Sequence, residues 1–309
     1  MAAPEAIPEG ARFARLRTAD GVKLRAACWP GRKLLGTVLI LQGRTECIEK
    51  YYETIGELRA RGYAVAAFDW RGQGLSDRAL TDRHKGHVWD FAAYHRDLDT
   101  FLDGFVASAP ELPKPYYILA HSMGAHIAVR YLHERPEPFA RAVLCSPMAY
   151  INTAPLPHFI ARAIAAAGVK CGLTEAYVPG GKAYDPARNP FEGNPLTHDA
   201  ERYAREAQLF RANPDLVIGS PTLGWLDAAY RSMAMAGQAH FCAAIKTPAL
   251  LVYGSEETVS SPDQQALLAS QLGQCQALCI TGARHEILQE TDAIRAQFWR
   301  AFDSFMKRP

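Results

Sequence analysis

The chain has 309 residues, of which 49% are hydrophobic and 21% are charged. That length and composition predict a globular protein with a sizeable core, built as one large α/β domain or as two small domains. The 34 basic and 32 acidic residues almost balance, so neither nucleic acid nor an anionic membrane is expected to bind through a polybasic surface.

The sequence also bears on where the protein works. The longest apolar stretches, such as residues 38–41 and 163–169, are far shorter than the roughly 18 residues of a membrane span. Residues 1–10 have neither the basic nor the apolar region of a secretory signal. The seven cysteines are scattered without CxxC or zinc-ribbon spacing. These features predict a soluble protein in a reducing, cytoplasmic compartment, where any contact with the inner membrane is peripheral.

The first half of the chain alternates predicted strands and helices. A hairpin is expected where residues 12–18 and 22–29 flank the turn Ala19-Asp20-Gly21. His95 lies on the apolar face of a predicted helix and is interpreted as a packed core histidine rather than a metal ligand. Short apolar runs predict buried strands at 37–41, 63–68, 116–120 and 142–145. Helices are expected at 48–61, 91–105 and 123–134.

From about residue 148 to residue 240 the alternation stops. This stretch carries many prolines and glycines, and its short helical patterns lie at 159–167 and 200–210. Strands and helices then alternate again, at 249–253, from about 263, at 277–280 and at 292–306. Repeated βα units predict a mostly parallel sheet with helices on both faces. The interruption is therefore interpreted as an insertion into a discontinuous core made of residues 1–147 and 241–309.

A nucleophile elbow is predicted at Ala120-His121-Ser122-Met123-Gly124. The segment stands between an apolar strand and a helix, which is the context that this motif requires. The tight turn would expose the hydroxyl of Ser122, and small residues at 120 and 124 leave room for the neighbouring backbone. Ala120 replaces the usual first glycine of the motif. Ser122 is therefore the candidate nucleophile.

A serine hydroxyl is a poor nucleophile near neutral pH, so it needs a base and an acid that orients the base. The order along the chain in this type of fold is serine, acid, histidine. His285 follows the last predicted strand and is the candidate base, the alternative being a histidine on a surface loop. Glu257 follows the strand at 249–253 and is the candidate acid, with Glu256 as its rival. In a further alternative both glutamates are solvated loop charges, and the acid that orients the base lies elsewhere in the chain.

The oxyanion that forms during acyl transfer needs two preorganised N–H donors. Met123, the residue after the candidate nucleophile, should supply one of them. The loop after the strand at 37–41 reads Gln42-Gly43-Arg44-Thr45-Glu46. The N–H of Arg44 is the candidate for the second donor, because Gly43 lets the backbone turn closely there. The side chain of Arg44 is also a candidate salt-bridge partner of Glu46.

With these motifs in order, the sequence resembles the lysophospholipase and monoacylglycerol lipase branch of the α/β-hydrolases. The resemblance covers nearly the whole chain, from about Arg12 to Phe305. Besides the elbow, the motifs that carry it are Leu41 to Glu46 with Glu49-Lys50-Tyr51, Asp69-Trp70-Arg71-Gly72-Gln73-Gly74-Leu75-Ser76, Leu196-Thr197-His198, Pro221-Thr222-Leu223-Gly224-Trp225 and Ala283-Arg284-His285-Glu286.

The sequence departs from the family pattern at two places. Gln42-Gly43 stands where monoacylglycerol lipases usually have His-Gly. The glutamine is typical of the bacterial lysophospholipase subgroup. Glu257 stands where Asp is usual. The family implies an α/β-hydrolase fold in which 148–240 forms a helical cap over the active site. Gln42, Gly43 and Trp225 are then candidate substrate contacts.

Basic and acidic residues are equally numerous in the predicted cap, which argues against electrostatic docking on anionic lipid. Its apolar run Pro155 to Ile160 is open to two interpretations. It lines an acyl tunnel or touches a bilayer, or it packs the cap on the body.

No cofactor and no metal are predicted. Gly72-x-Gly74 lacks the rest of a dinucleotide fingerprint, and no P-loop string occurs. His84 and His87 have HxxH spacing, but without a nearby cluster of ligands a simple loop is favoured.

The expected function is hydrolysis of a monoacyl lipid ester, a lysophospholipid or a monoacylglycerol, through an acyl-enzyme. Head group, acyl length and oligomeric state are left open. The alternatives are a carboxylesterase or thioesterase for smaller acyl groups, and a non-catalytic ligand-binding protein of the same fold.

Overall fold

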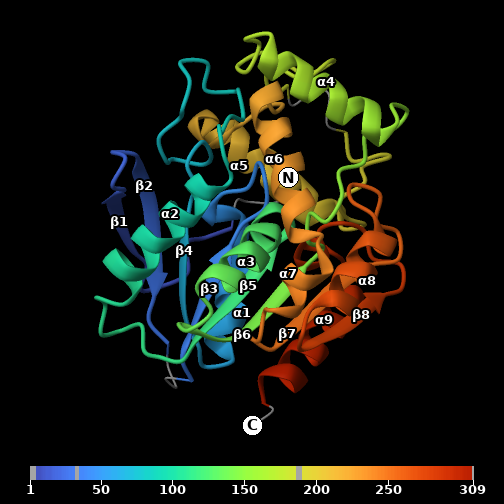
Figure 1. The fold of residues 1–309 in the computed structure, drawn as a ribbon. Helices are drawn as coiled ribbons and strands as arrows, with labels where there is room; N and C mark the ends of the chain where they lie inside the picture. Colours follow the sequence, from blue (N-terminus) through green and yellow to red (C-terminus); the bar gives the residue numbers. More distant parts are fainter. Residues whose placement is uncertain (1–4, 32–34, 186–189, 308–309) are drawn as a thin grey trace.

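One eight-stranded sheet forms the centre of the structure, a computed structural model that describes residues 5–31, 35–185 and 190–307. The strands lie in the order β1-β2-β4-β3-β5-β6-β7-β8 (Figure 1). The predicted hairpin is present as β1 (Arg12–Arg17) and β2 (Lys23–Trp29), and β2 pairs antiparallel with β4. The remaining strands run parallel to one another: β3 (Thr37–Leu41), β4 (Ala64–Phe68), β5 (Tyr116–His121), β6 (Phe139–Cys145), β7 (Ala249–Gly254) and β8 (Cys275–Ile280).

Helices cover both faces of this sheet, which confirms the predicted α/β fold class. Alternate residues of a strand enter opposite cores: in β6, Ala142 and Leu144 belong to one apolar cluster, and Val143 and Cys145 to the other. The first cluster includes side chains of α2 (Ala92–Phe101), α3 (Ser122–Glu134) and α8 (Pro262–Gln271). The second includes side chains of α1 (Tyr52–Ala60) and α9 (Asp292–Met306).

The predicted elements agree closely with the observed ones, with local differences. The helix expected at 48–61 begins with a 3₁₀ turn, Ile48–Tyr51, and ends before Gly62, whose φ is +103°. The helix expected at 91–105 ends in a π-helical turn, Leu102–Val106. His95 is buried and its Nδ1 lies 2.8 Å from a carboxylate oxygen of Glu134, as expected of a core histidine.

Between β6 and β7 the chain forms four α-helices among its described residues. They are α4 (His158–Lys170), α5 (Ala200–Ala212), α6 (Leu223–Ala236) and α7 (Ala239–Ala243). Helix α6, which the sequence patterns did not predict, is largely buried and its side chains join the core that contains α3. Ser232 of α6 lies 2.6 Å from His126 Nε2 on α3. The interrupting segment is therefore partly integrated with the body. In Figure 1, α4 lies at its outer end.

Within the described part of the chain, no helix is both long and apolar enough to cross a membrane.

The elbow after β5 depends on a glycine that has no room for a side chain. A Cβ at Gly124 would lie 2.2 Å from the carbonyl oxygen of Leu41 and 2.4 Å from that of Gln42. We expect Gly124→Ala to lower the free energy of unfolding by about 1–3 kcal/mol, because α3 must move away from β3. Urea titration followed by circular dichroism measures the change.

Gly56 in α1 supplies the control, because a Cβ there would meet nothing within 4 Å. Gly56→Ala should raise the free energy of unfolding by about 0.5–1 kcal/mol, the usual gain in a helix interior. Equal stability of Gly124→Ala and the unmodified protein would contradict the close-packing argument.

Candidate active site

Ser122 lies at the turn from β5 into α3, in a strained backbone conformation. Its φ is +50°, a region that residues other than glycine rarely adopt. The preceding residue His121 is still extended, so the chain turns sharply at Ser122 and then enters the helix. This is the geometry of a nucleophile elbow, which presents the hydroxyl at the carboxyl edge of the sheet.

His285 and Glu257 reach Ser122 from two loops at the same edge of the sheet. His285 follows β8, and its Nε2 lies 3.0 Å from Ser122 Oγ. Its Nδ1 lies 2.5 Å from Glu257 Oε2, on the loop after β7. Both His285 and Glu257 are buried, so the alternative of a surface-loop histidine is wrong. The structure thus brings together the three residues in the order that the sequence suggested.

The two rival glutamates point to different histidines. Glu257 contacts His285, whereas the half-exposed Glu256 lies 3.2 Å from His198 Nε2. The backbone N–H groups of Val259 and Ser260 donate to Glu257 Oε1 at 2.7 and 3.0 Å, which fixes the carboxylate in place. Only Glu257 has the position of an acid that orients the base.

The electrostatic setting keeps Glu257 ionised. Burial by itself would raise the pKa of Glu257, but the hydrogen bond and charge of His285, together with the two backbone N–H donors, lower the pKa to about 2. A carboxylate that stays charged can hold the imidazole in one tautomer and stabilise the imidazolium that forms when the histidine takes a proton.

The N–H groups expected to bind the oxyanion are free of intramolecular acceptors within the described residues. Met123 is in the first turn of α3, where backbone N–H groups have no helical partner. No acceptor among the described residues takes a hydrogen bond from the N–H of Arg44. Gly43 cannot serve instead, because its N–H donates to Glu46 Oε2.

Three comparisons with known proteins can be set beside this geometry. The family model described as "Serine aminopeptidase, S33" matches residues 32–292. Lysophospholipase L2 of Escherichia coli (strain K12) is 34% identical over 281 residues, which cover 88% of this chain and 80% of that protein. Monoglyceride lipase of Homo sapiens is 31% identical over 150 residues, 48% of this chain and 47% of that protein.

Among solved structures, a soluble variant of monoglyceride lipase from Saccharomyces cerevisiae with a substrate analog has a TM-score of 0.76 at 18% identity. The match covers 99% of this chain and 95% of that one, and shows the fold. The chain belongs to the serine aminopeptidase S33 family of α/β-hydrolases. The family resemblance noted from the motifs is thereby confirmed.

In this α/β-hydrolase a glutamine from the Asp69–Ser76 motif shapes the oxyanion loop. Gln73 is buried; its side-chain amide donates to the carbonyl of Gly43 at 2.9 Å and accepts from the N–H of Thr45 at 3.2 Å. Trp70 Nε1 donates to the carbonyl of Gln42 at 3.0 Å. The motif was visible in the sequence, but nothing in its spacing assigned a role to Gln73.

Glu46 is a second residue that sequence reasoning missed as part of the site. Its carboxylate accepts from Gly43 N–H and from Tyr51 Oη (2.6 Å), and it lies 3.1 Å from Lys50 Nζ and 3.0 Å from His121 Nδ1. The salt bridge expected between Arg44 and Glu46 is therefore wrong, because Lys50 and His121 occupy that carboxylate.

The Leu196-Thr197-His198 motif holds the loop that carries His285. The N–H of Glu286 donates to the carbonyl of Leu196 at 2.8 Å, and Thr197 Oγ1 donates to the carbonyl of Gln289 at 2.7 Å. The buried Glu290 accepts from the backbone N–H groups of Arg284 and His198 at 2.9 and 3.0 Å. The interrupting segment thus supports the histidine of the candidate triad.

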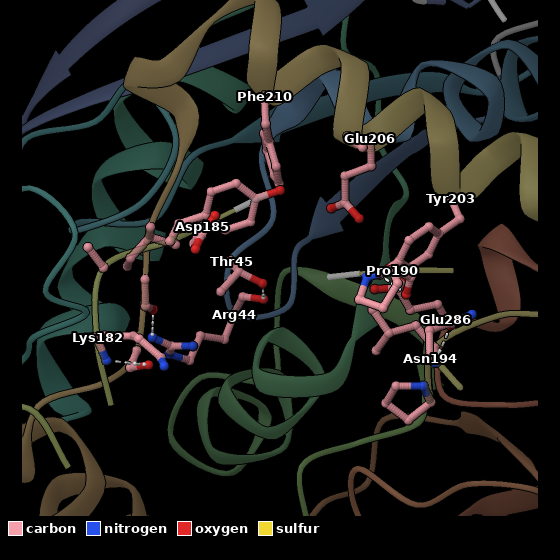
Figure 2. A pocket seen from close by; sticks show the side chains of 18 of the residues that line it. Arg44, Thr45, Lys182, Asp185, Pro190, Asn194, Tyr203, Glu206, Phe210 and Glu286 are labelled. Carbon is pink, nitrogen blue, oxygen red and sulfur yellow. Dashed lines mark hydrogen bonds between the residues drawn. The ribbon is translucent and has the colours of Figure 1, made fainter. Parts of the chain in front are cut away.

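A cavity of about 770 Å³ opens beside this centre. Arg44 and Thr45 of the oxyanion loop, α5 side chains and Glu286 line it, whereas Ser122 is not one of its lining residues (Figure 2). Trp225 does not line it either: the ring is buried and donates to Tyr94 Oη at 3.2 Å. Gln42 is fully buried as well. Substrate contacts of Gln42, Gly43 and Trp225 stay predictions.

The HxxH pair of the sequence serves a structural contact. His87 Nδ1 lies 2.7 Å from Thr222 Oγ1 at the start of α6. Over the described ranges no group of three or more His, Cys, Asp or Glu residues is arranged to hold a metal ion.

Acid should weaken the fold through Glu257. Its folded-state pKa of about 2 lies below the ordinary value of 4.5, so its carboxylate stabilises the folded state above pH 4.5. That contribution is lost as the pH falls through about 2. We expect Glu257→Gln to be less stable than the unmodified protein at pH 7, and the difference to shrink between pH 4.5 and pH 2. Urea titrations across this pH range measure it.

Glu256→Gln is the matched control, since the side chain of Glu256 is 53% exposed and does not contact His285. We expect it to behave like the unmodified protein at every pH. A stability difference for Glu257→Gln that does not change with pH would contradict the assigned ionisation.

Proposed function

We propose that this protein is a serine hydrolase that cleaves the carboxylic ester of a monoacyl lipid. The observation that supports it most is the relay Ser122–His285–Glu257 at a strained elbow, with two unoccupied N–H groups beside it. The substrate class follows from the relatives, which include a lysophospholipase that shares 34% identity over most of both chains.

In the proposed reaction Ser122 Oγ attacks the ester carbonyl while His285 Nε2 takes the hydroxyl proton. The N–H groups of Met123 and Arg44 bind the oxyanion of the tetrahedral intermediate. When the intermediate collapses, the C–O bond breaks and His285 returns the proton to the leaving alcohol. Water, deprotonated by the same histidine, then attacks the acyl-enzyme and releases the fatty acid. Glu257 holds the imidazole throughout.

We further propose that residues 148–240 act as a cap whose outer end touches lipid. Several apolar side chains on or beside α4 are exposed: Leu156 (36%), Phe159 (72%), Ile164 (36%) and Leu173 (53%). Packing of the run 155–160 on the body, the other interpretation of the sequence, is wrong for Leu156 and Phe159. His158 does pack inward, stacking on Tyr150 with ring centroids 4.7 Å apart.

Ser122→Ala should abolish labelling by a fluorophosphonate probe, because the probe needs the activated hydroxyl. Ester hydrolysis should fall by about 10⁴-fold or more, to the level that the oxyanion donors alone sustain. Gel fluorescence and hydrolysis of monoacyl lipids, short esters and thioesters measure the two effects.

Ser146 is the matched control: it directly follows β6 at the same edge, has a φ of +43° and is fully buried. Ser146→Ala should be labelled like the unmodified protein. Undiminished labelling of Ser122→Ala would exclude Ser122 as the nucleophile, and absence of labelling of the unmodified protein would favour the non-catalytic alternative. A preference for short esters across acyl lengths would favour the carboxylesterase.

The double change Leu156→Ser and Phe159→Ser should lower hydrolysis of monoacyl lipid in vesicles several-fold, because less apolar surface can enter the bilayer. Hydrolysis of a dispersed short ester should be unaffected. Leu267→Ser, which removes a 47%-exposed leucine on α8, is the control and should change neither rate. Equal losses on vesicles and on the dispersed ester would contradict lipid contact by this segment.

A further inference from the structure

The guanidinium of Arg44 is a partly buried cation without a carboxylate partner among the described residues. Its Nη2 donates to the carbonyl of Gly219, and its buried Nε has no partner within the described chain. Burial lowers the pKa of Arg44 to about 10, and no neighbouring carboxylate opposes this effect. A desolvated cation without a counter-charge is costly, and an anion from outside the chain that reached the guanidinium would offset this cost.

Neighbouring residues hold this side chain in a defined slot. Its Cζ lies 5.3 Å from the ring centroid of Trp225, within the range of a cation–π contact. Gly86 also lies against the guanidinium, since a Cβ there would approach Arg44 Nη2 to 2.6 Å. The slot directs the guanidinium to the wall of the 770 Å³ cavity, as Figure 2 shows.

Charged side chains of both signs line the cavity. Arg44, Lys182 and Asp185 lie in one part of it, and Tyr203, Glu206 and Glu286 in another (Figure 2). Glu206 and Glu286 lie 3.1 and 2.6 Å from Lys50 Nζ. Both cations that line the cavity thus lie in the part away from Glu206 and Glu286, where the anionic end of a ligand would bind.

We propose that this cavity binds the head group of a lysophospholipid, with its phosphodiester on the guanidinium of Arg44. The inference rests on the proposed function and narrows its substrate class. The main-chain N–H of Arg44 is the proposed oxyanion donor, so the ester carbonyl oxygen and the phosphate would contact the two ends of one residue. A glycerol unit separates ester and phosphate in the lipid, and the arginine side chain provides a separation of similar length.

The two oxygens of a phosphodiester suit the forked donors of a guanidinium. The amine of an ethanolamine or choline group would extend towards Glu206 and Tyr203. A monoacylglycerol has no anion to offer, and would leave Arg44 unpaired. Lysophospholipids should therefore be preferred over monoacylglycerols of the same acyl chain.

The test compares the unmodified protein with Arg44→Gln on lysophosphatidylethanolamine and on monoacylglycerol with the same acyl chain. We expect the ratio of kcat/KM for the phospholipid to kcat/KM for the acylglycerol to fall by about 10- to 100-fold, the value of a charge-assisted hydrogen bond. The ratio removes any loss common to both substrates, such as a shift of the oxyanion loop.

Arg78→Gln is the matched control. Arg78 is a second arginine whose pKa burial lowers to about 10, but it donates to carbonyl groups, among them those of Gly72 and Gly74, and does not line the cavity. Its replacement should leave the ratio unchanged even where stability falls. An unchanged ratio in Arg44→Gln, or an equal change in Arg78→Gln, would overturn the inference.

Inhibition of short-ester hydrolysis separates a head-group site from a general anion site. Glycerophosphoethanolamine should inhibit the unmodified protein. Its inhibition constant for Arg44→Gln should be about tenfold higher. Inhibition by inorganic phosphate at equal or lower concentration would overturn the head-group assignment. Failure of the broader proposal looks different, because the unmodified protein would then hydrolyse neither lipid.

Discussion

The buried carboxylate of Glu46 joins the two loops on which the candidate site depends. Through Gly43 it fixes the oxyanion loop after β3, and through His121 it reaches the loop after β8, since His121 Nε2 lies 3.3 Å from the carbonyl oxygen of His285. Burial alone would raise the pKa of Glu46, but His121 and Lys50 lower it, and Glu46 in turn raises the pKa of His121 against the effect of burial. Glu46 and His121 thus link the loop of the candidate oxyanion donor to the loop of the candidate base.

Lys50 extends this network to the segment between β6 and β7. Its ammonium lies within 3.1 Å of carboxylates of Glu46, Glu206 and Glu286, which come from three different parts of the chain. Three carboxylates around one ammonium leave excess negative charge. Burial raises the pKa of Glu206 more than Lys50 lowers it, so that the pKa is about 7. The packing of α5 on the body is therefore coupled electrostatically to the candidate site through Lys50.

The sequence was enough to find residues whose position follows from topology. Ser122, Glu257 and His285 each come directly after a parallel strand, and the ends of such strands meet at one edge. It could not assign Gln73 or Glu46, whose roles depend on hydrogen bonds between segments far apart along the chain. Helix α6 was missed although Asp227 and Arg231 mark an exposed face, because its burial comes from packing against α3 and α4, which are far away along the chain or joined to it by irregular segments.

Arg44 shows how a functional demand can override local stability. Its main-chain N–H is the proposed oxyanion donor, and no carboxylate among the described residues offsets the desolvation of its side chain. A protein selected for stability alone would neutralise that charge, as the protein does for Arg25 with Glu49 and Asp69. The contrast between the buried Arg25 and the partly buried Arg44 separates scaffold from proposed site, because of these two only Arg44 lines a cavity with room for a counter-ion.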